Sequence, residues 1–297
     1  MSERNDQVEL SDYRNDIKPA WCPGCGDFPI LSAVQQALTE LEIPPHDTLF
    51  VSGIGQISKL PNYTSGNGFH TIHGRPLPAA TGAKLANPEL NVIVTSGDGD
   101  TYGIGGNHFL HTCRRNLDIT HIVGDNKIYG LTKGQYSPTS DQGFITKTTP
   151  EGSIEPPVNP ITTALASGAT FIARAFSGDV KHLQKTFEKA INHTGYSLVD
   201  VFQPCVTFNN VNTYDFYEER VYKLGEEEDY DTGDEEAARK KGLEWGDEIP
   251  IGVIFEAERP TYEEQVPGLK NGPITKKEID RKKWDDVDFE ELKKRYM

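Results

Sequence analysis

The stretch VIVTSGDGD, residues 92–100, decides the fold of this chain, because a short apolar run ends there in glycines and carboxylates. Three consecutive apolar residues, Val92 to Val94, are typical of a strand that is buried on both faces of a parallel sheet. The glycines behind them let the backbone approach a diphosphate, and the first turn of a following helix offers free N–H groups. Because ligands bind at the carboxyl ends of parallel strands, we expect a phosphate and metal site directly after this strand.

A second strand pattern of the same kind lies at residues 119–123 and is followed by Asp125 and Asn126. Residues 102–115 between the two strands are long enough for a crossover helix, so the pattern indicates a βαβ unit. Each polar sequence taken alone is typical of a turn. Together they place Asp98 and Asn126 at the ends of adjacent strands, where a carboxylate, an amide oxygen and a backbone carbonyl can hold Mg²⁺ beside a diphosphate.

The alternation of helix and strand patterns continues on both sides of this unit. We predict helices at 26–41, 78–86, 162–167 and 180–191, strands at 49–51, 171–173 and 198–202, and a loop at 66–75. Alternating strands and helices favour an α/β fold with a doubly wound, mostly parallel sheet. We assign this domain to residues 1–210.

Residues 211–297 have a different composition. Eight acidic residues lie between positions 226 and 236, and residues 273–297 are charged throughout. We therefore expect a charged C-terminal extension that wraps around the first domain and contacts a partner, rather than a second globular domain.

Composition and charge exclude several classes of protein. The chain has 297 residues, of which 36% are hydrophobic and 25% charged, as in soluble globular proteins. Its net charge of −15 has the wrong sign for a protein that binds nucleic acid through phosphate contacts. Because it has neither an apolar run of about 18 residues nor the regions of a signal peptide, we expect a cytoplasmic protein that does not enter a membrane.

Six motifs that follow one another in a fixed order give a more specific assignment. They are Trp21-Cys22-Pro-Gly-Cys25-Gly, Ser52-Gly-Ile-Gly55, His73-Gly-Arg75, Gly97-Asp-Gly-Asp100, Asp125-Asn126-Lys-Ile-Tyr-Gly-Leu-Thr-Lys-Gly-Gln135 and Gln203-Pro-Cys205. Over residues 15–210 this series resembles the β subunit of 2-oxoacid:ferredoxin oxidoreductases, which bind thiamine diphosphate. The resemblance implies the thiamine diphosphate-binding fold. It also implies oxidative decarboxylation of a 2-oxoacid with coenzyme A to acyl-CoA and CO₂, with ferredoxin as electron acceptor, in a reaction that can run in either direction.

The resemblance further implies the residues of the cofactor site. Asp98, Asn126 and the backbone of Ile128 match the positions that hold Mg²⁺ in this family. The residues expected around thiamine diphosphate are Gly53, Ile54, Gly55, His73, Gly97, Asp98, Gly99, Asp100, Asn126, Ile128, Gly130 and Leu131. For His73, a structural histidine in a glycine-rich turn is the alternative.

The resemblance also implies an obligate α subunit, which supplies the glutamate that activates the cofactor, so that this chain alone is expected to be inactive. Lys59 and Lys133, together with Leu131, are expected to recognise the substrate. A lysine ammonium can pair with the distal carboxylate of a dicarboxylic acid, which favours 2-oxoglutarate over pyruvate. The alternative is that both lysines are solvated.

Cys22, Cys25 and Cys205 match three of the four cysteines that hold a [4Fe–4S] cluster in this family, but Gln56 stands at the fourth position. Three cases remain open: a cluster with a fourth ligand such as Gln56, water or a partner group, a three-iron cluster, or no cluster. Cys113 lies on the expected crossover helix, and we interpret it as a small buried apolar residue.

Other classes explain parts of the sequence. The Cys22–Cys25 segment is also typical of a dithiol redox protein or of a structural zinc site. Another thiamine diphosphate-dependent decarboxylase or synthase is a closer alternative, although such chains usually carry both cofactor domains. A subunit that no longer binds the cofactor is the non-enzymatic alternative, and the presence of both Asp98 and Asn126 argues against it.

Overall fold

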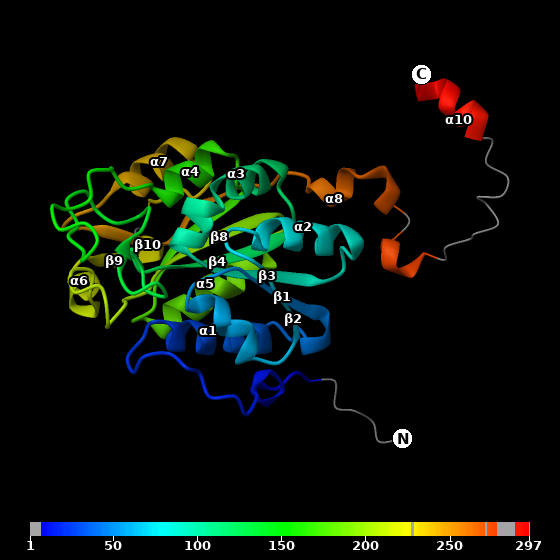
Figure 1. Cartoon of the computed structure of the whole chain (residues 1–297). Helices are drawn as coiled ribbons and strands as arrows, with labels where there is room; N and C mark the ends of the chain where they lie inside the picture. The colour runs from blue at the N-terminus through cyan, green and yellow to red at the C-terminus, as the bar shows by residue number, and fades with distance from the viewer. Residues whose placement is uncertain (1–6, 227–228, 271, 278–288, 297) are drawn as a thin grey trace.

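The centre of the molecule is an eight-stranded sheet, shown in Figure 1 as the computed structural model, which describes residues 7–226, 229–270, 272–277 and 289–296. The strand order is β2-β1-β3-β4-β8-β7-β10-β9. All neighbours are parallel except β7 and β10, which are antiparallel. The strands are β1 (Thr48–Ser52), β2 (Asn67–His70), β3 (Asn91–Gly97), β4 (Ile119–Asp125), β7 (Phe171–Phe176), β8 (Tyr196–Phe202), β9 (Val221–Lys223) and β10 (Ile249–Glu256).

Helices cover both faces of this sheet (Figure 1). On one face lie α1 (Asp27–Glu40) and α5 (Val180–Asn192), which contact each other. On the other lie α2 (Pro76–Ala86), α3 (Gly106–Arg115), α4 (Pro160–Ala166) and α7 (Glu235–Leu243). The remaining described α-helices are α6 (Tyr214–Glu218), α8 (Tyr262–Gln265) and α10 (Phe289–Tyr296). The prediction of a doubly wound α/β fold is confirmed.

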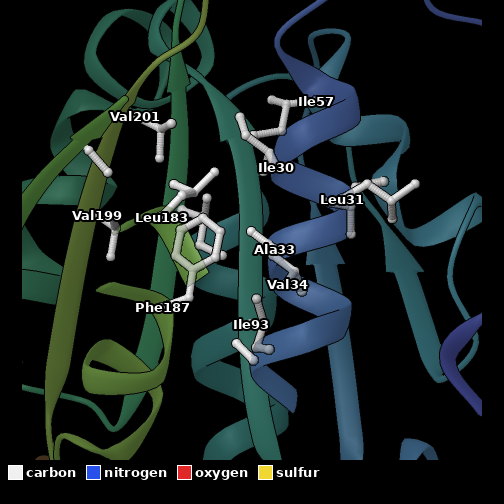
Figure 2. Packing of buried hydrophobic residues seen from close by; sticks show 14 of the residues in the cluster. Ile30, Leu31, Ala33, Val34, Ile57, Ile93, Leu183, Phe187, Val199 and Val201 are labelled. Atoms are coloured by element: carbon white, nitrogen blue, oxygen red, sulfur yellow. The ribbon is translucent and has the colours of Figure 1, made fainter. Parts of the chain in front are cut away.

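The core between α1, α5 and the sheet shows why these segments become helices (Figure 2). Ile30, Ala33 and Val34 of α1 are spaced so that they share one face, and all three are fully buried. They meet Leu183 and Phe187, which lie four positions apart on α5 and are also buried. Burial of this apolar stripe therefore fixes α1, and with it the cysteine turn that precedes it, against this face of the sheet.

One strand lies where we predicted a loop, at residues 66–75. The residues of β2 are exposed and include Gly68, so they lack the apolar alternation that marks a strand. Parallel pairing with β1 at the edge of the sheet, with Phe69 opposite Val51, makes this segment a strand.

The C-terminal region departs further from expectation. The prediction of a wrapping extension is wrong for residues 221–256, because β9 and β10 join the main sheet. Phe176 and Phe202 share a core cluster with Tyr217, Ile249 and Ile251, so the two parts of the chain are packed together. A domain division at residue 210 stays a prediction. Part of the acidic segment, residues 227–228, and residues 278–288 lie outside the described residues.

Candidate functional site

A pocket opens where β1, β3, β4 and β8 end. The residues that line it come from the loops after these strands and from the cysteine turn before α1. From the predicted set it contains Ile54, Gly55, Gln56, His73, Gly97, Asp98, Gly99, Asp100, Asn126, Ile128, Gly130, Leu131, Cys22, Cys25 and Cys205. Gly53, Lys59 and Lys133 are not among the lining residues. The fold therefore brings most of the predicted cofactor residues into one place.

Asp98 follows β3 and is almost fully buried. Its Oδ2 accepts hydrogen bonds from Ser137 Oγ at 2.5 Å and from Thr139 Oγ1 at 2.7 Å. Burial, and then the nearby charge of Asp125, raise the pKa of Asp98 above its usual range. Thr139 Oγ1 also lies 2.7 Å from Asp125 Oδ1, although one hydroxyl can donate its proton to only one carboxylate. Because these two buried carboxylates share one hydrogen-bond donor, a cation bound beside them would stabilise their negative charges.

Asn126 lies beside this pair because β3 and β4 are in register, with Gly97 opposite Gly124. Its Nδ2 donates to Gln203 Oε1 at 2.8 Å, which holds the amide in place, and its Oδ1 accepts from Ile128 N at 3.2 Å. The Asp98 carboxylate, the Asn126 amide oxygen and a backbone carbonyl are hard oxygen donors that fit Mg²⁺. In the described ranges, no three or more His, Cys, Asp and Glu side chains converge on a single ion.

Asp100 lines the pocket, and its carboxylate also binds the surrounding loops. Its Oδ1 accepts from Ile54 N at 3.0 Å and from Gly74 N at 2.8 Å, and it lies 2.7 Å from His73 Nδ1. A Cβ on Gly53 would lie 1.9 Å from Asp100 Oδ2, so only glycine fits there. Burial raises the pKa of Asp100, and these backbone donors oppose that effect. Asp100 therefore holds two predicted cofactor loops together, and His73 has both a pocket position and a structural contact.

Several residues of this site were missed by sequence reasoning. Ser137 and Thr139 belong to no recognised motif, and they reach Asp98 only through the fold. Tyr129 packs so closely on Gly99 that a Cβ there would lie 2.1 Å from its ring, and its hydroxyl donates to Gly99 O at 3.2 Å. Tyr129 belongs to the motif at residues 125–135, and this position is the signal that could have identified it.

The three predicted cluster cysteines line the same pocket. Cys22 is exposed and accepts from Thr207 Oγ1 at 3.1 Å, whereas Cys25 is buried and accepts from Gln203 Nε2 at 3.3 Å. Burial, followed by the nearby Asp27, raises the pKa of Cys25. The donors to the sulfurs of Cys22 and Cys25 fit thiolates that bind iron. Cys25 Sγ itself donates to Asp27 Oδ2 at 3.4 Å, so binding of iron there would release the thiol proton.

Cys113 is far from this group in the fold, since it is fully buried on α3 within the opposite core. Our interpretation of it as a buried apolar residue is confirmed.

The two predicted substrate lysines lie outside the pocket lining. Lys133 is exposed and has a φ of 77°, in the left-handed region, within a loop whose residues Gly130, Leu131 and Thr132 do line the pocket. Lys59 lies on the 3₁₀ helix Ile57–Asn62, and its charge acts on the buried carboxylate of Asp27. The structure thus places Lys133 next to the pocket rim and Lys59 within electrostatic range of Asp27, the first residue of α1.

Comparisons with known proteins agree with this geometry. Residues 50–201 match the family of thiamine pyrophosphate enzymes, C-terminal TPP binding domain, and residues 205–271 match the C-terminal region of the pyruvate ferredoxin oxidoreductase beta subunit. A 2-oxoacid:ferredoxin oxidoreductase subunit beta from Aeropyrum pernix is 50% identical, over 86% of this chain and 84% of its own length. The 2-oxoglutarate synthase subunit KorB of Methanocaldococcus jannaschii is 37% identical, over 88% of this chain and 96% of its own.

A solved structure gives the same result in three dimensions. The 2-oxoglutarate:ferredoxin oxidoreductase from Magnetococcus marinus, with 2-oxoglutarate, coenzyme A and succinyl-CoA bound, is 39% identical and aligns with a TM-score of 0.86. The alignment covers 91% of this chain and 92% of that one.

Proposed function

Because this chain belongs to the β subunits of 2-oxoacid:ferredoxin oxidoreductases, we propose that its pocket binds thiamine diphosphate with Mg²⁺ and acts on 2-oxoglutarate. In the overall reaction one 2-oxoacid, one coenzyme A and two oxidised ferredoxins give one acyl-CoA, one CO₂, one proton and two reduced ferredoxins. Thiamine diphosphate supplies the carbon nucleophile and the electron storage that this reaction requires.

The observation that carries the proposal is the convergence of Asp98, Asn126 and Ile128 at the ends of two paired strands. Asp98 and Asn126, each held by further hydrogen bonds, would orient the metal and thereby the diphosphate. Gly97, which lines the pocket, carries no side chain that would keep a diphosphate away from the backbone, whereas the missing side chain of Gly99 makes room for Tyr129. The residues of this chain therefore position and polarise the bound group.

An α subunit that covers the pocket is part of the proposal. Large apolar side chains are exposed on the loops at this end of the sheet, namely Ile72, Ile104, Leu131 and Val206. Exposed apolar side chains of this kind mark interaction surfaces when they gather. Coenzyme A and ferredoxin bind to the enzyme that the α and β subunits form together.

The preference for 2-oxoglutarate is tested at Lys133. Two observations support this substrate: a cation stands at the pocket rim, and relatives such as the M. jannaschii protein bear the name 2-oxoglutarate synthase. With Lys133→Met in the assembled enzyme, we expect kcat/KM for 2-oxoglutarate to fall by roughly 10–100-fold, the value of a charge-assisted hydrogen bond. The value for pyruvate should change little.

Ferredoxin reduction with each 2-oxoacid measures this prediction, and Lys189→Met, at an exposed lysine on α5, is the matched control. Equal losses on both substrates would remove Lys133 from substrate recognition. Release of CO₂ without ferredoxin reduction would favour a different thiamine diphosphate-dependent decarboxylase.

A further inference from the structure

Gln56 is held beside the cysteine turn by its own backbone. The indole Nε1 of Trp21 donates to Gln56 O at 2.9 Å, and Trp21 directly precedes Cys22 in the chain. Gln56 lines the pocket together with Cys22, Cys25 and Cys205. A residue from the loop after β1 therefore shares a wall with the three thiols.

The side-chain oxygen of Gln56 lacks a protein partner. Within the described part of the chain, Gln56 Oε1 is buried and accepts no hydrogen bond. A buried acceptor without a donor is unfavourable, and native proteins satisfy nearly all such atoms with protein, water or a bound group. The two sulfurs of Cys22 and Cys25, by contrast, each have a donor from this chain.

From this arrangement we infer that Gln56 Oε1 is the fourth ligand of a four-iron cluster whose other ligands are Cys22, Cys25 and Cys205. The inference rests on the proposed function. Three thiolates and one amide oxygen complete the four corners of such a cluster, and the iron satisfies the buried acceptor. No other cysteine is available, since Cys113 lies in the core on the opposite face of the sheet.

A neutral oxygen in place of a thiolate changes the properties of the site. It leaves the cluster with one negative charge fewer, close to the buried carboxylate of Asp27, which lies 3.4 Å from Cys25 Sγ. A less negative cluster accepts an electron more readily, so its reduced form is favoured. An oxygen ligand also holds iron more weakly than a thiolate. We therefore expect a higher reduction potential and faster loss of one iron than with four cysteines.

The test compares Gln56→Leu, Gln56→Cys and the control Cys113→Ala in the αβ enzyme, purified without oxygen. The readouts are iron, sulfide and thiamine diphosphate per αβ unit, the electron paramagnetic resonance spectrum, the midpoint potential, and the rate of iron transfer to a chelator. Thiamine diphosphate content reports whether each variant is still folded at this end of the sheet.

We expect about four irons in the wild type and in Cys113→Ala. Gln56→Leu should lose about one iron in four and show the spectrum of an oxidised three-iron cluster, with thiamine diphosphate retained. Gln56→Cys should keep its irons, lower the midpoint potential and release iron to the chelator roughly 10–100-fold more slowly.

Two results would overturn the ligand assignment: three irons in the wild type, or an unchanged spectrum, potential and iron content in Gln56→Leu. Bound thiamine diphosphate without any iron would also overturn it, while leaving the proposed decarboxylation in place. Iron without thiamine diphosphate would instead contradict the proposed function.

Discussion

The Asp98 carboxylate illustrates how a single predicted residue depends on neighbours from elsewhere in the chain. Its Oδ2 has two hydroxyl donors, Ser137 and Thr139, and both come from the segment after β6 (Gln135–Tyr136). Residues that orient a metal ligand in this way usually change metal affinity without touching the metal. The function of Asp98 can therefore be tested by mutating a residue that donates a hydrogen bond to it.

We expect Ser137→Ala to weaken Mg²⁺ binding by roughly 10–100-fold, because one hydrogen bond that orients Asp98 is lost. Asp98→Ala should abolish retention of thiamine diphosphate. Titration of the αβ enzyme with Mg²⁺ at saturating thiamine diphosphate measures both effects. The control is Ser11→Ala, at an exposed serine of the 3₁₀ helix Leu10–Tyr13. Undiminished Mg²⁺ affinity in Asp98→Ala would show that Asp98 does not bind the metal.

His121 predicts a dependence of stability on pH. It is fully buried on β4, with Nε2 2.7 Å from Ser96 Oγ and Nδ1 2.7 Å from Tyr196 Oη. Burial lowers the pKa of His121 to about 3, whereas an unfolded histidine titrates near about 6.5. Below about pH 6.5 the histidine of the unfolded chain therefore binds a proton that His121 of the folded chain does not, and the contribution of this one group to the free energy of unfolding falls as the pH falls.

The contribution of His121 to the free energy of unfolding changes with a slope that approaches about 1.4 kcal/mol per pH unit. Urea unfolding of the wild type and of His121→Gln between pH 7 and pH 5 measures it. The variant should be less stable at neutral pH but should lose part of the slope. Equal slopes in the two proteins would show that His121 does not titrate in this way.

At the scale of elements, glycines decide how closely the loops after β1 and β3 approach each other. Gly53 faces the carboxylate of Asp100, which lies in the π-helical turn Gly99–Ile104 and also binds Ile54 and Gly74. This carboxylate joins the ends of two strands, so a side chain at residue 53 must displace it.

We expect Gly53→Ala to reduce thiamine diphosphate retention strongly, because its Cβ would lie 1.9 Å from Asp100 Oδ2. The matched control is Gly82→Ala in α2, where a Cβ meets nothing within 4 Å. Alanine in a helix interior is favoured over glycine, so the control should gain roughly 0.5–1 kcal/mol of stability. The thiamine diphosphate content and the urea unfolding of both variants measure these effects. An active, cofactor-loaded Gly53→Ala enzyme would show that a side chain at residue 53 does not disturb the Asp100 carboxylate.

The whole molecule joins its N-terminal and C-terminal parts in one sheet. β10 pairs with β7 in the middle of the chain, and Ile249 and Ile251 of β10 share a cluster with Phe176 and Phe202. Removal of β10 would expose this apolar surface and the edge of β7. Among the described residues, no helix has the length and apolarity needed to span a membrane.

A chain that ends at residue 210 should therefore fail to form a stable monomer. We expect it to aggregate or to lack a cooperative thermal transition, as circular dichroism and size-exclusion chromatography would show. The full chain is the control. Cooperative unfolding of the shortened chain would instead support residues 1–210 as an independent domain.

Local patterns determined the central part of this protein from the sequence alone. The strands β3 and β4 were predictable because burial on both faces leaves a continuous apolar run, and α1 and α5 were predictable because burial on one face leaves a helical period. The polar residues after those strands identified the pocket for the same reason, since parallel strands place their carboxyl ends together.

Only the tertiary structure decided which residues complete the site. Ser137 lies 39 positions after Asp98, and the direction of the Asp100 carboxylate depends on loops 26 and 46 positions away. Such contacts leave no period in the sequence. β2 was missed for a related reason, because its residues are exposed and only pairing with β1 makes them a strand. β10 has a buried apolar pattern of its own, and what only the fold decided is that it joins the main sheet antiparallel to β7.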